Sequence, residues 1–184
     1  MTPLLAPVHA LVIVDAQMGL LDGPRAVPRA GAVIDHIGVV LRQARHDGAL
    51  VVHLQHDGGP GALDHAGSPG WCIHPARAPL ATDAVIAKTT DDGFAGTGLD
   101  ELLRAAHVER FALAGLLSEM CVSATARSGL ALGYQIVLVR NGHATYALDD
   151  IADTTVSRVA EHALGDAITL TAADQIAFAS RGVR

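Results

Sequence analysis

The sequence is poor in several features that mark particular classes of protein. Aromatic residues make up only 3% of its 184 residues, and its acidic and basic residues are scattered, with a formal net charge of −6. Such a distribution gives no basic surface for nucleic acid or for an anionic membrane, so we expect neither as a partner. No apolar run reaches the length of a membrane span. The N-terminus lacks a basic region followed by a long apolar core, so no signal peptide is expected.

Cysteine is also scarce, since only Cys72 and Cys121 are present. Two cysteines do not make a disulfide scaffold, and without an export signal we expect free thiols and a cytoplasmic protein. Hydrophobic residues nevertheless make up 50% of the chain, with a mean hydropathy of +0.33, which argues against disorder. The length suits one sizeable core, so we predict a single domain over residues 1–184.

Short apolar runs alternate with helical patterns along the chain. The runs are rich in Val, Ile and Leu, which is typical of parallel strands buried on both faces. This alternation predicts an α/β fold, a three-layer αβα sandwich around a mainly parallel, roughly six-stranded, Rossmann-like sheet with right-handed crossovers. The predicted strands are 9–15, 50–54, 84–87, 110–115, 135–139 and 167–170, and the predicted helices are 30–46, 99–107, 118–132 and 151–163.

Three chemically active residues stand at the ends of predicted strands. Asp15 ends the first apolar run, Lys88 ends the third, and Cys121 lies where the fourth run passes into a helix. The unpaired amides and the dipole at a helix start favour a thiolate. Open α/β sheets hold their chemistry at these strand ends. Taken alone, each residue has an ordinary interpretation: a small buried cysteine, a capping aspartate and an exposed lysine.

Several motifs together resemble the isochorismatase-like cysteine hydrolases, the family that includes nicotinamidases. The resemblance runs from about residue 10 to about residue 170, and the motifs are specific only as a set. The residues that carry it are Asp15 and Gln17, Lys88 and Thr89, Phe94, Gly96 and Thr97, and the segment from Gly115 to Val122.

This resemblance implies an Asp-Lys-Cys triad formed by Asp15, Lys88 and Cys121. It also implies a cis peptide between Leu116 and Leu117, and an oxyanion hole made by the amides of Leu117 and Cys121. Asp15 would then accept the thiol proton and return it to the leaving nitrogen, while Lys88 would hold both negative groups in place.

The expected function is therefore hydrolysis of a C–N bond in a small amide, open or cyclic, through a thioester. No nucleotide-binding glycine motif follows the first strand, so no such cofactor is expected. Two alternatives stay open. One is vinyl-ether hydrolysis of the isochorismatase type, which does not need the family's cysteine, and the other is a non-catalytic scaffold or redox-responsive homologue.

Metal binding depends on a histidine-rich segment after the second predicted strand. The resemblance suggests His56, Asp57 and His74 as candidate ligands, because Trp71-Cys72-Ile73-His74 matches the Trp-x-x-His of nicotinamidases. The Asp-x-His pair of those enzymes is incomplete, however, since Gly58 follows Asp57 and a second histidine is missing. We therefore expect no metal cofactor.

Six residues in segments near the predicted strand ends are candidates for binding substrate. Aromatic rings there suit a compact pocket for a small planar or cyclic group. Packing against the core and stabilisation of the helix dipole are the ordinary roles for these residue types. Small residues in segment 124–131 and the habit of the family suggest a homodimer or homotetramer. The candidates are Gln17, His56, Trp71, Phe94, Glu119 and Tyr146.

Overall fold

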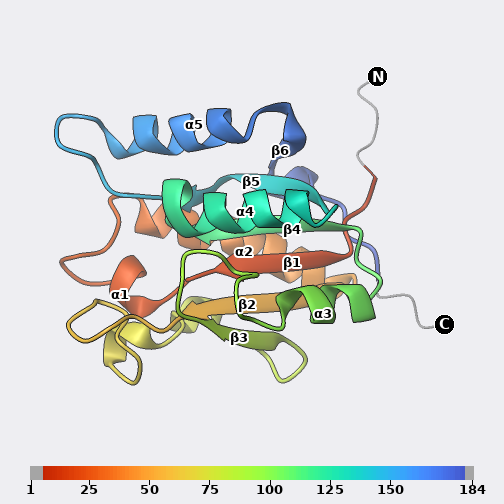
Figure 1. Cartoon of the computed structure of the whole chain (residues 1–184), viewed down its shortest axis with the longest axis horizontal. Coiled ribbons are helices and arrows are strands. Elements are labelled where there is room, and N and C mark those ends of the chain that lie inside the picture. Colours follow the sequence, from red (N-terminus) through yellow and green to blue (C-terminus); the bar gives the residue numbers. More distant parts are fainter. Residues whose placement is uncertain (1–5, 181–184) are drawn as a thin grey trace.

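All six predicted strands form and pair into one sheet in a computed structural model that describes residues 6–180. The strand order is β3-β2-β1-β4-β5-β6, and every pair is parallel (Figure 1). The strands are β1 (Ala10–Val14), β2 (Leu50–His56), β3 (Ala84–Lys88), β4 (Arg110–Leu116), β5 (Gln135–Ala144) and β6 (Ile168–Ala172). The predicted α/β class and its six-stranded parallel sheet are confirmed.

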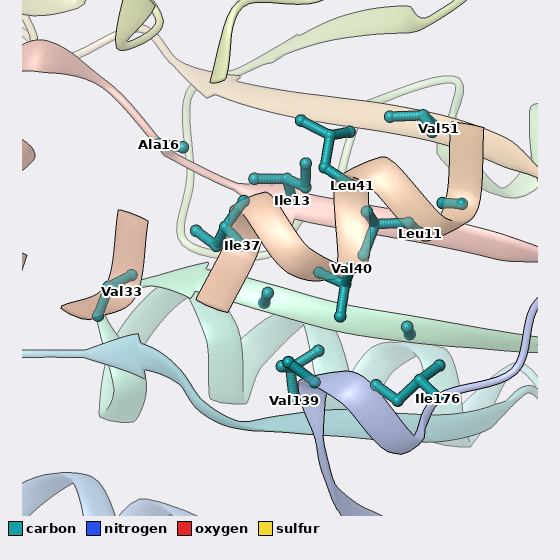
Figure 2. Close-up of a cluster of buried hydrophobic side chains, with 14 of the residues drawn as sticks. Leu11, Ile13, Ala16, Val33, Ile37, Val40, Leu41, Val51, Val139 and Ile176 are labelled. Atoms are coloured by element: carbon teal, nitrogen blue, oxygen red, sulfur yellow. The ribbon is translucent and has the colours of Figure 1, made fainter. Parts of the chain in front are cut away.

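Helices cover both faces of this sheet, as predicted. Figure 2 shows Ile37 and Leu41 of α2 over Ile13 of β1, within one buried core. The alternate residues Val12 and Val14 point into the second core on the opposite face. The helices are α1 (Met18–Leu21), α2 (Ala30–His46), α3 (Leu99–Ala105), α4 (Ser123–Ala131) and α5 (Asp153–Leu164), with short turns η1 (Pro69–Trp71), η2 (Pro75–Arg77), η3 (Ser118–Val122), η4 (Gly165–Ala167) and η5 (Ala173–Gln175). None of the helices within residues 6–180 combines the length and apolarity needed to cross a membrane.

The edge strands differ from the prediction of burial on both faces. Val85 of β3 is 47% exposed, and four of the five residues of β6 are only partly buried. Each of these strands has a neighbouring strand on one side only, so its residues stay partly exposed even where they are apolar. The prediction holds for β1, all of whose residues are buried.

The predicted helix 118–132 is divided. Its first turn, η3, is π-helical, with the Val122 amide donating to the Leu117 carbonyl at 3.1 Å, and α4 follows. Strand β5 also runs past its predicted end at Val139, after a shift in its register against β4. Both irregularities lie at the carboxyl edge of the sheet, where single π-helical turns often mark function.

The order in which strands are added to the sheet reverses at β1. Strands β2 and β3 lie on one side of β1, whereas β4, β5 and β6 lie on the other. The carboxyl ends of β1 and β4 therefore form a topological switch point, the place where open α/β sheets hold ligands.

Gly115 allows β4 to approach β1 closely at this point. Its φ is +130°, and a Cβ there would overlap the backbone of Val14. We expect Gly115→Ala to lower the free energy of unfolding by about 2–4 kcal/mol, measured by urea denaturation. In Gly31→Ala the new Cβ meets nothing within 4 Å, so this control in α2 should gain about 0.5 kcal/mol. A Gly115→Ala variant as stable as the wild type would contradict the close approach.

Candidate active site

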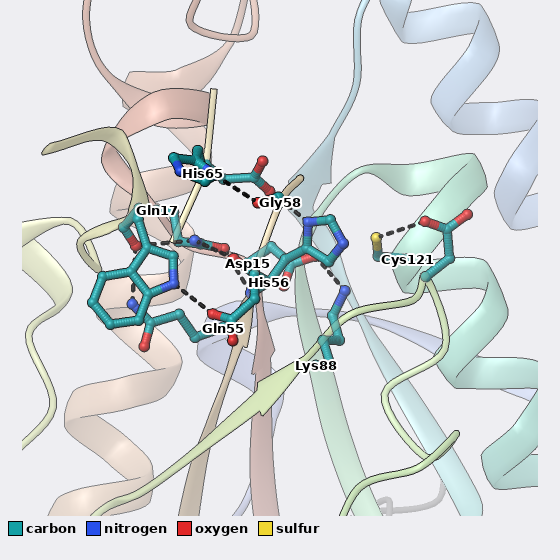
Figure 3. Close-up of polar contacts among 12 residues, drawn as sticks. Asp15, Gln17, Gln55, His56, Gly58, His65, Lys88 and Cys121 are labelled. Atoms are coloured by element: carbon teal, nitrogen blue, oxygen red, sulfur yellow. Dashed lines mark hydrogen bonds and ion pairs between the residues drawn. The ribbon is translucent and has the colours of Figure 1, made fainter. Parts of the chain in front are cut away.

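The three residues predicted to form a triad lie together at the switch point. The ammonium of Lys88 donates to Asp15 Oδ2 at 2.8 Å, and the two side chains are only 0% and 2% exposed (Figure 3). Cys121, in η3, is 8% exposed, and its pKa responds to the charges of both Asp15 and Lys88. The site is thus a nearly closed group of one thiol, one carboxylate and one ammonium.

Local backbone structure explains how Asp15 and Lys88 meet. Lys88 lies two strands away from β1, and its long side chain spans that separation, with a further hydrogen bond to the Thr90 carbonyl at 3.0 Å. Asp15 has a φ of +49°, a conformation that a non-glycine residue seldom adopts. Its carbonyl accepts from the Gln17 amide at 2.7 Å, which turns the chain sharply after β1.

One oxygen of Asp15 is left without a conventional partner. Among the described residues, Asp15 Oδ1 is buried and makes no hydrogen bond that meets normal distance criteria. A buried polar atom of this kind costs free energy unless function uses it. Burial raises the pKa of Asp15 above its ordinary value, although the charge of Lys88 opposes the shift. The free oxygen is therefore more basic than that of an exposed aspartate.

The protonation state of Cys121 differs from the one expected at a helix start. Burial, followed by the negative charge of Asp15, raises the pKa of the thiol, and Lys88 only partly offsets this. This direction is opposite to the thiolate expected at a helix start. Burial lowers the pKa of Lys88, but the charge of Asp15 raises it above the ordinary value, so Lys88 stays charged.

A fourth group, Asp91, contacts the thiol and was missed in the sequence. Cys121 Sγ donates to Asp91 Oδ1 at 3.5 Å, and the negative charge of Asp91 contributes to raising the pKa of Cys121. Asp91 is exposed and lies three residues after Lys88, beyond the end of β3. The rule that identified Asp15 and Lys88, an ionisable residue just past a strand, applies to it as well.

Gln17 and Trp71, predicted to bind substrate, instead hold the long loop after β2. The Gln17 amide donates to the carbonyls of His56 and Trp71, and its oxygen accepts from the His56 amide, each at 2.9 Å. Gln17 is fully buried, so none of its polar groups is left for a ligand. The indole of Trp71 donates to Asp57 at 2.6 Å. These contacts correct the prediction for Gln17 and tie Trp71 to the loop.

Phe94, Tyr146 and Glu119 also make contacts within the protein. Phe94 lies 5.9 Å from the ring of Tyr134, between centroids, and packs on the core, which is the ordinary role considered for it. The Tyr146 hydroxyl donates to the Arg25 carbonyl at 2.6 Å. Glu119 is exposed and accepts from Thr145 at 2.8 Å. None of these contacts involves the triad.

His56 is the predicted binding residue that the structure brings to the triad. It is the register partner of Lys88 across β2 and β3, and its ring is drawn beside the triad in Figure 3. The ring is oriented by Asp64, whose carboxylate lies 2.6 Å from His56 Nδ1.

Each candidate metal ligand makes a hydrogen bond within the protein. Asp57 accepts a hydrogen bond from the Trp71 indole, and His56 is hydrogen-bonded to Asp64. His74 Nδ1 accepts from the Ala76 amide at 3.2 Å, which caps η2. Within residues 6–180, no three His, Cys, Asp or Glu side chains converge in the way that a metal site requires.

Known proteins share this fold and sequence. The isochorismatase domain family matches residues 9–173. Streptothricin hydrolase of Streptomyces noursei is 50% identical over 170 residues, which cover 89% of this chain and 62% of that protein. The chain thus spans less than two thirds of that relative's length.

Two solved structures are also similar. An isochorismatase from Pseudomonas putida KT2440 superposes with a TM-score of 0.86 and 27% identity over 93% of each chain. N-carbamoylsarcosine amidase from Thermoplasma acidophilum superposes with a TM-score of 0.76 and 28% identity, over 90% of this chain and 96% of that one. The chain therefore belongs to the isochorismatase-like cysteine hydrolase family.

Proposed function

We propose that this protein hydrolyses the C–N bond of a small amide, open or cyclic, with Cys121 as nucleophile. The observation that carries the proposal is a nearly buried thiol beside a carboxylate with one unpartnered oxygen, Asp15 Oδ1. The names of the relatives, streptothricin hydrolase and N-carbamoylsarcosine amidase, support hydrolytic chemistry on small molecules.

Acylation begins with transfer of the Cys121 proton to Asp15 Oδ1. Sγ bonds to the amide carbon, and the carbonyl electron pair moves onto oxygen. The amides of Leu117 and Cys121 serve as donors to this oxyanion, and each such donor typically lowers the barrier by about 3–4 kcal/mol. The expected cis peptide between Leu116 and Leu117 is present in the turn that carries these amides. The C–N bond then breaks, and the nitrogen takes the proton from Asp15.

Deacylation reverses these proton transfers with water. Asp15 takes a proton from water as the water oxygen bonds to the thioester carbon. The second tetrahedral intermediate expels the thiolate, which recovers the proton from Asp15, and the acid product leaves. Lys88 stays charged throughout and stabilises whichever of the two neighbours is negative.

The two alternative functions are supported less well. Vinyl-ether hydrolysis does not use the cysteine, whereas here the thiol donates to the Asp91 carboxylate and the negative charge of Asp15 acts on it. A scaffold or redox-responsive homologue has no use for an orphaned buried carboxylate oxygen beside that thiol.

The protein's setting is part of the proposal. Free Cys72 and Cys121 are consistent with a cytoplasmic location. Exposed Met120, Leu148 and Ile151 lie on the segments after β4 and β5, near the edge that holds the triad, and support a homodimer or homotetramer. We propose no metal cofactor and neither nucleic acid nor membrane as a partner.

Cys121→Ser should fold normally and lose at least about a thousandfold in kcat. The reason is that a hydroxyl has a far higher pKa than a thiol, so Asp15 deprotonates it much less readily. The assay is release of ammonia or acid from a panel of small amides, lactams and ureides. Cys72→Ser is the matched control, since Cys72 is exposed, and it should keep wild-type turnover. Full activity in Cys121→Ser would rule out the cysteine mechanism.

The pH profile of Cys121 alkylation should report the charges around the thiol. Asp91→Asn removes a negative charge, lowers the pKa of Cys121 and should speed alkylation at pH 7 about three- to tenfold. Lys88→Met removes the positive charge, raises the pKa and should slow alkylation. Peptide mass spectrometry separates Cys121 from Cys72, which serves as the internal reference. An identical profile in both variants would contradict these contacts.

Activity should survive prolonged chelation, and purified protein should hold well under one metal ion per chain by elemental analysis. The reason is that no three His, Cys, Asp or Glu side chains within residues 6–180 lie together as a metal site requires. His74→Ala should therefore keep its turnover. Stoichiometric Zn, Fe or Mn, lost together with activity in His74→Ala, would refute this.

A further inference from the structure

A buried chain of polar side chains lies behind the turn that carries Cys121, and the mechanism above does not use it. Ser118 Oγ lies 2.8 Å from His143 Nδ1 and 3.1 Å from Ser157 Oγ. The other ring nitrogen, His143 Nε2, lies 3.1 Å from Glu161 Oε1. Ser118, His143 and Ser157 are 1%, 2% and 3% exposed, so the contacts among these three residues are shielded from water.

The two ends of this chain have defined donors. The hydrogen bond from His143 holds the pKa of Glu161 below its ordinary value, so this carboxylate accepts. His143 Nδ1 then faces the Ser118 hydroxyl, which can either donate or accept. At the other end, Arg29 donates to Ser157 Oγ at 3.4 Å, and the Ser157 and Ser118 hydroxyls share a hydrogen bond. Every member thus has a partner.

A hydroxyl, an imidazole and a carboxylate in a line are also the groups of a serine hydrolase. Here the hydroxyl is enclosed, since Ser118 is 1% exposed, and no substrate carbonyl can reach it. A second nucleophilic site is excluded on that ground. The constellation serves instead to hold the backbone on which Ser118 lies.

Ser118 is the first residue of η3 and stands directly after Leu117 and three residues before Cys121. Its carbonyl accepts from the Ser123 hydroxyl at 2.7 Å, so the turn is anchored by both main-chain and side-chain atoms. The register shift between β4 and β5 places His143 opposite Gly115, next to this turn. Strand β5 and helix α5 therefore hold the nucleophile's turn from the side away from Asp15.

We propose that His143 is a positioning residue for catalysis, which acts through Ser118 to keep the Cys121 thiol and the Leu117 amide in place. This inference rests on the proposed amide hydrolysis. Displacement of reacting groups by about 1 Å costs about a hundredfold in rate, so a modest loosening of η3 has a measurable effect.

Two near-isosteric variants of His143 separate its two contacts. In His143→Asn the side-chain amide lies near the position of Nδ1, so the hydrogen bond with Ser118 is kept and the one with Glu161 is lost. In His143→Gln the side-chain amide reaches the position of Nε2, so the hydrogen bond with Glu161 is kept and the one with Ser118 is lost. We expect His143→Gln and Ser118→Ala to lower kcat about ten- to a hundredfold with KM nearly unchanged, and His143→Asn to lose less than about threefold. Val159→Ala, on the exposed face of α5, is the control.

The rate of Cys121 alkylation at pH 8 gives a readout that needs no substrate. A looser turn exposes the thiol and brings its pKa back toward the ordinary value, so alkylation should accelerate severalfold in His143→Gln and Ser118→Ala. It should stay near the wild-type rate in His143→Asn. If no amide is turned over but this pattern holds, the proposed function fails and the positioning role stands.

The inference is overturned if His143→Gln matches the wild type in both kcat and alkylation. It is equally overturned if His143→Asn loses as much as His143→Gln, because loss of the contact with Glu161 would then matter as much as loss of the contact with Ser118. Ser118→Ala removes a single oxygen, so it decides the question if His143→Gln does not fold. Wild-type kcat and alkylation in Ser118→Ala would count against the proposal.

Discussion

The ion pair between Lys88 and Asp15 is the interaction on which the site depends. Removing both charges from water is costly, and their attraction repays the cost only when the geometry is good. That geometry requires β1, β2 and β3 to lie side by side in register, because the two residues come from strands that are not neighbours. A buried pair of this kind is weak support for stability. Its value lies in holding a negative oxygen beside the Cys121 thiol.

Burial shapes the chemistry of this site more than any single charge. It raises the pKa of Asp15 and of Cys121 together, which keeps the thiol protonated and strengthens the base beside it. The proposed nucleophile is therefore formed only when a proton moves to Asp15, so thiolate formation is coupled to attack. A preformed thiolate, as the helix start alone would favour, would be open to side reactions with other electrophiles.

The sheet was predictable because apolar runs, a local pattern, mark the strands. The rule that polar residues just past parallel strands converge points to Asp15 and Lys88. Their grouping with Cys121 as a triad came mainly from the family resemblance, because each of the three residues alone has an ordinary interpretation. The role of Gln17 was not predictable, since an amide suits a ligand and a distant carbonyl equally well. The buried contact of His143 depends on an irregular register in β5, which no periodicity in the sequence reveals.

The loop after β2 is held at its base by side chains that form hydrogen bonds with main-chain atoms. Gln17 bonds to the backbone of His56 and Trp71, and Gln55 also donates to the Trp71 carbonyl at 2.9 Å. Every amino acid supplies the same carbonyl and, proline aside, the same amide. Exchange of the side chains at positions 56 and 71 would therefore leave these backbone hydrogen bonds in place, and only the contacts of His56 with Asp64 and of Trp71 with Asp57 would be lost. The base of the loop thus depends on main-chain atoms that substitutions at these two positions retain, proline at position 56 aside.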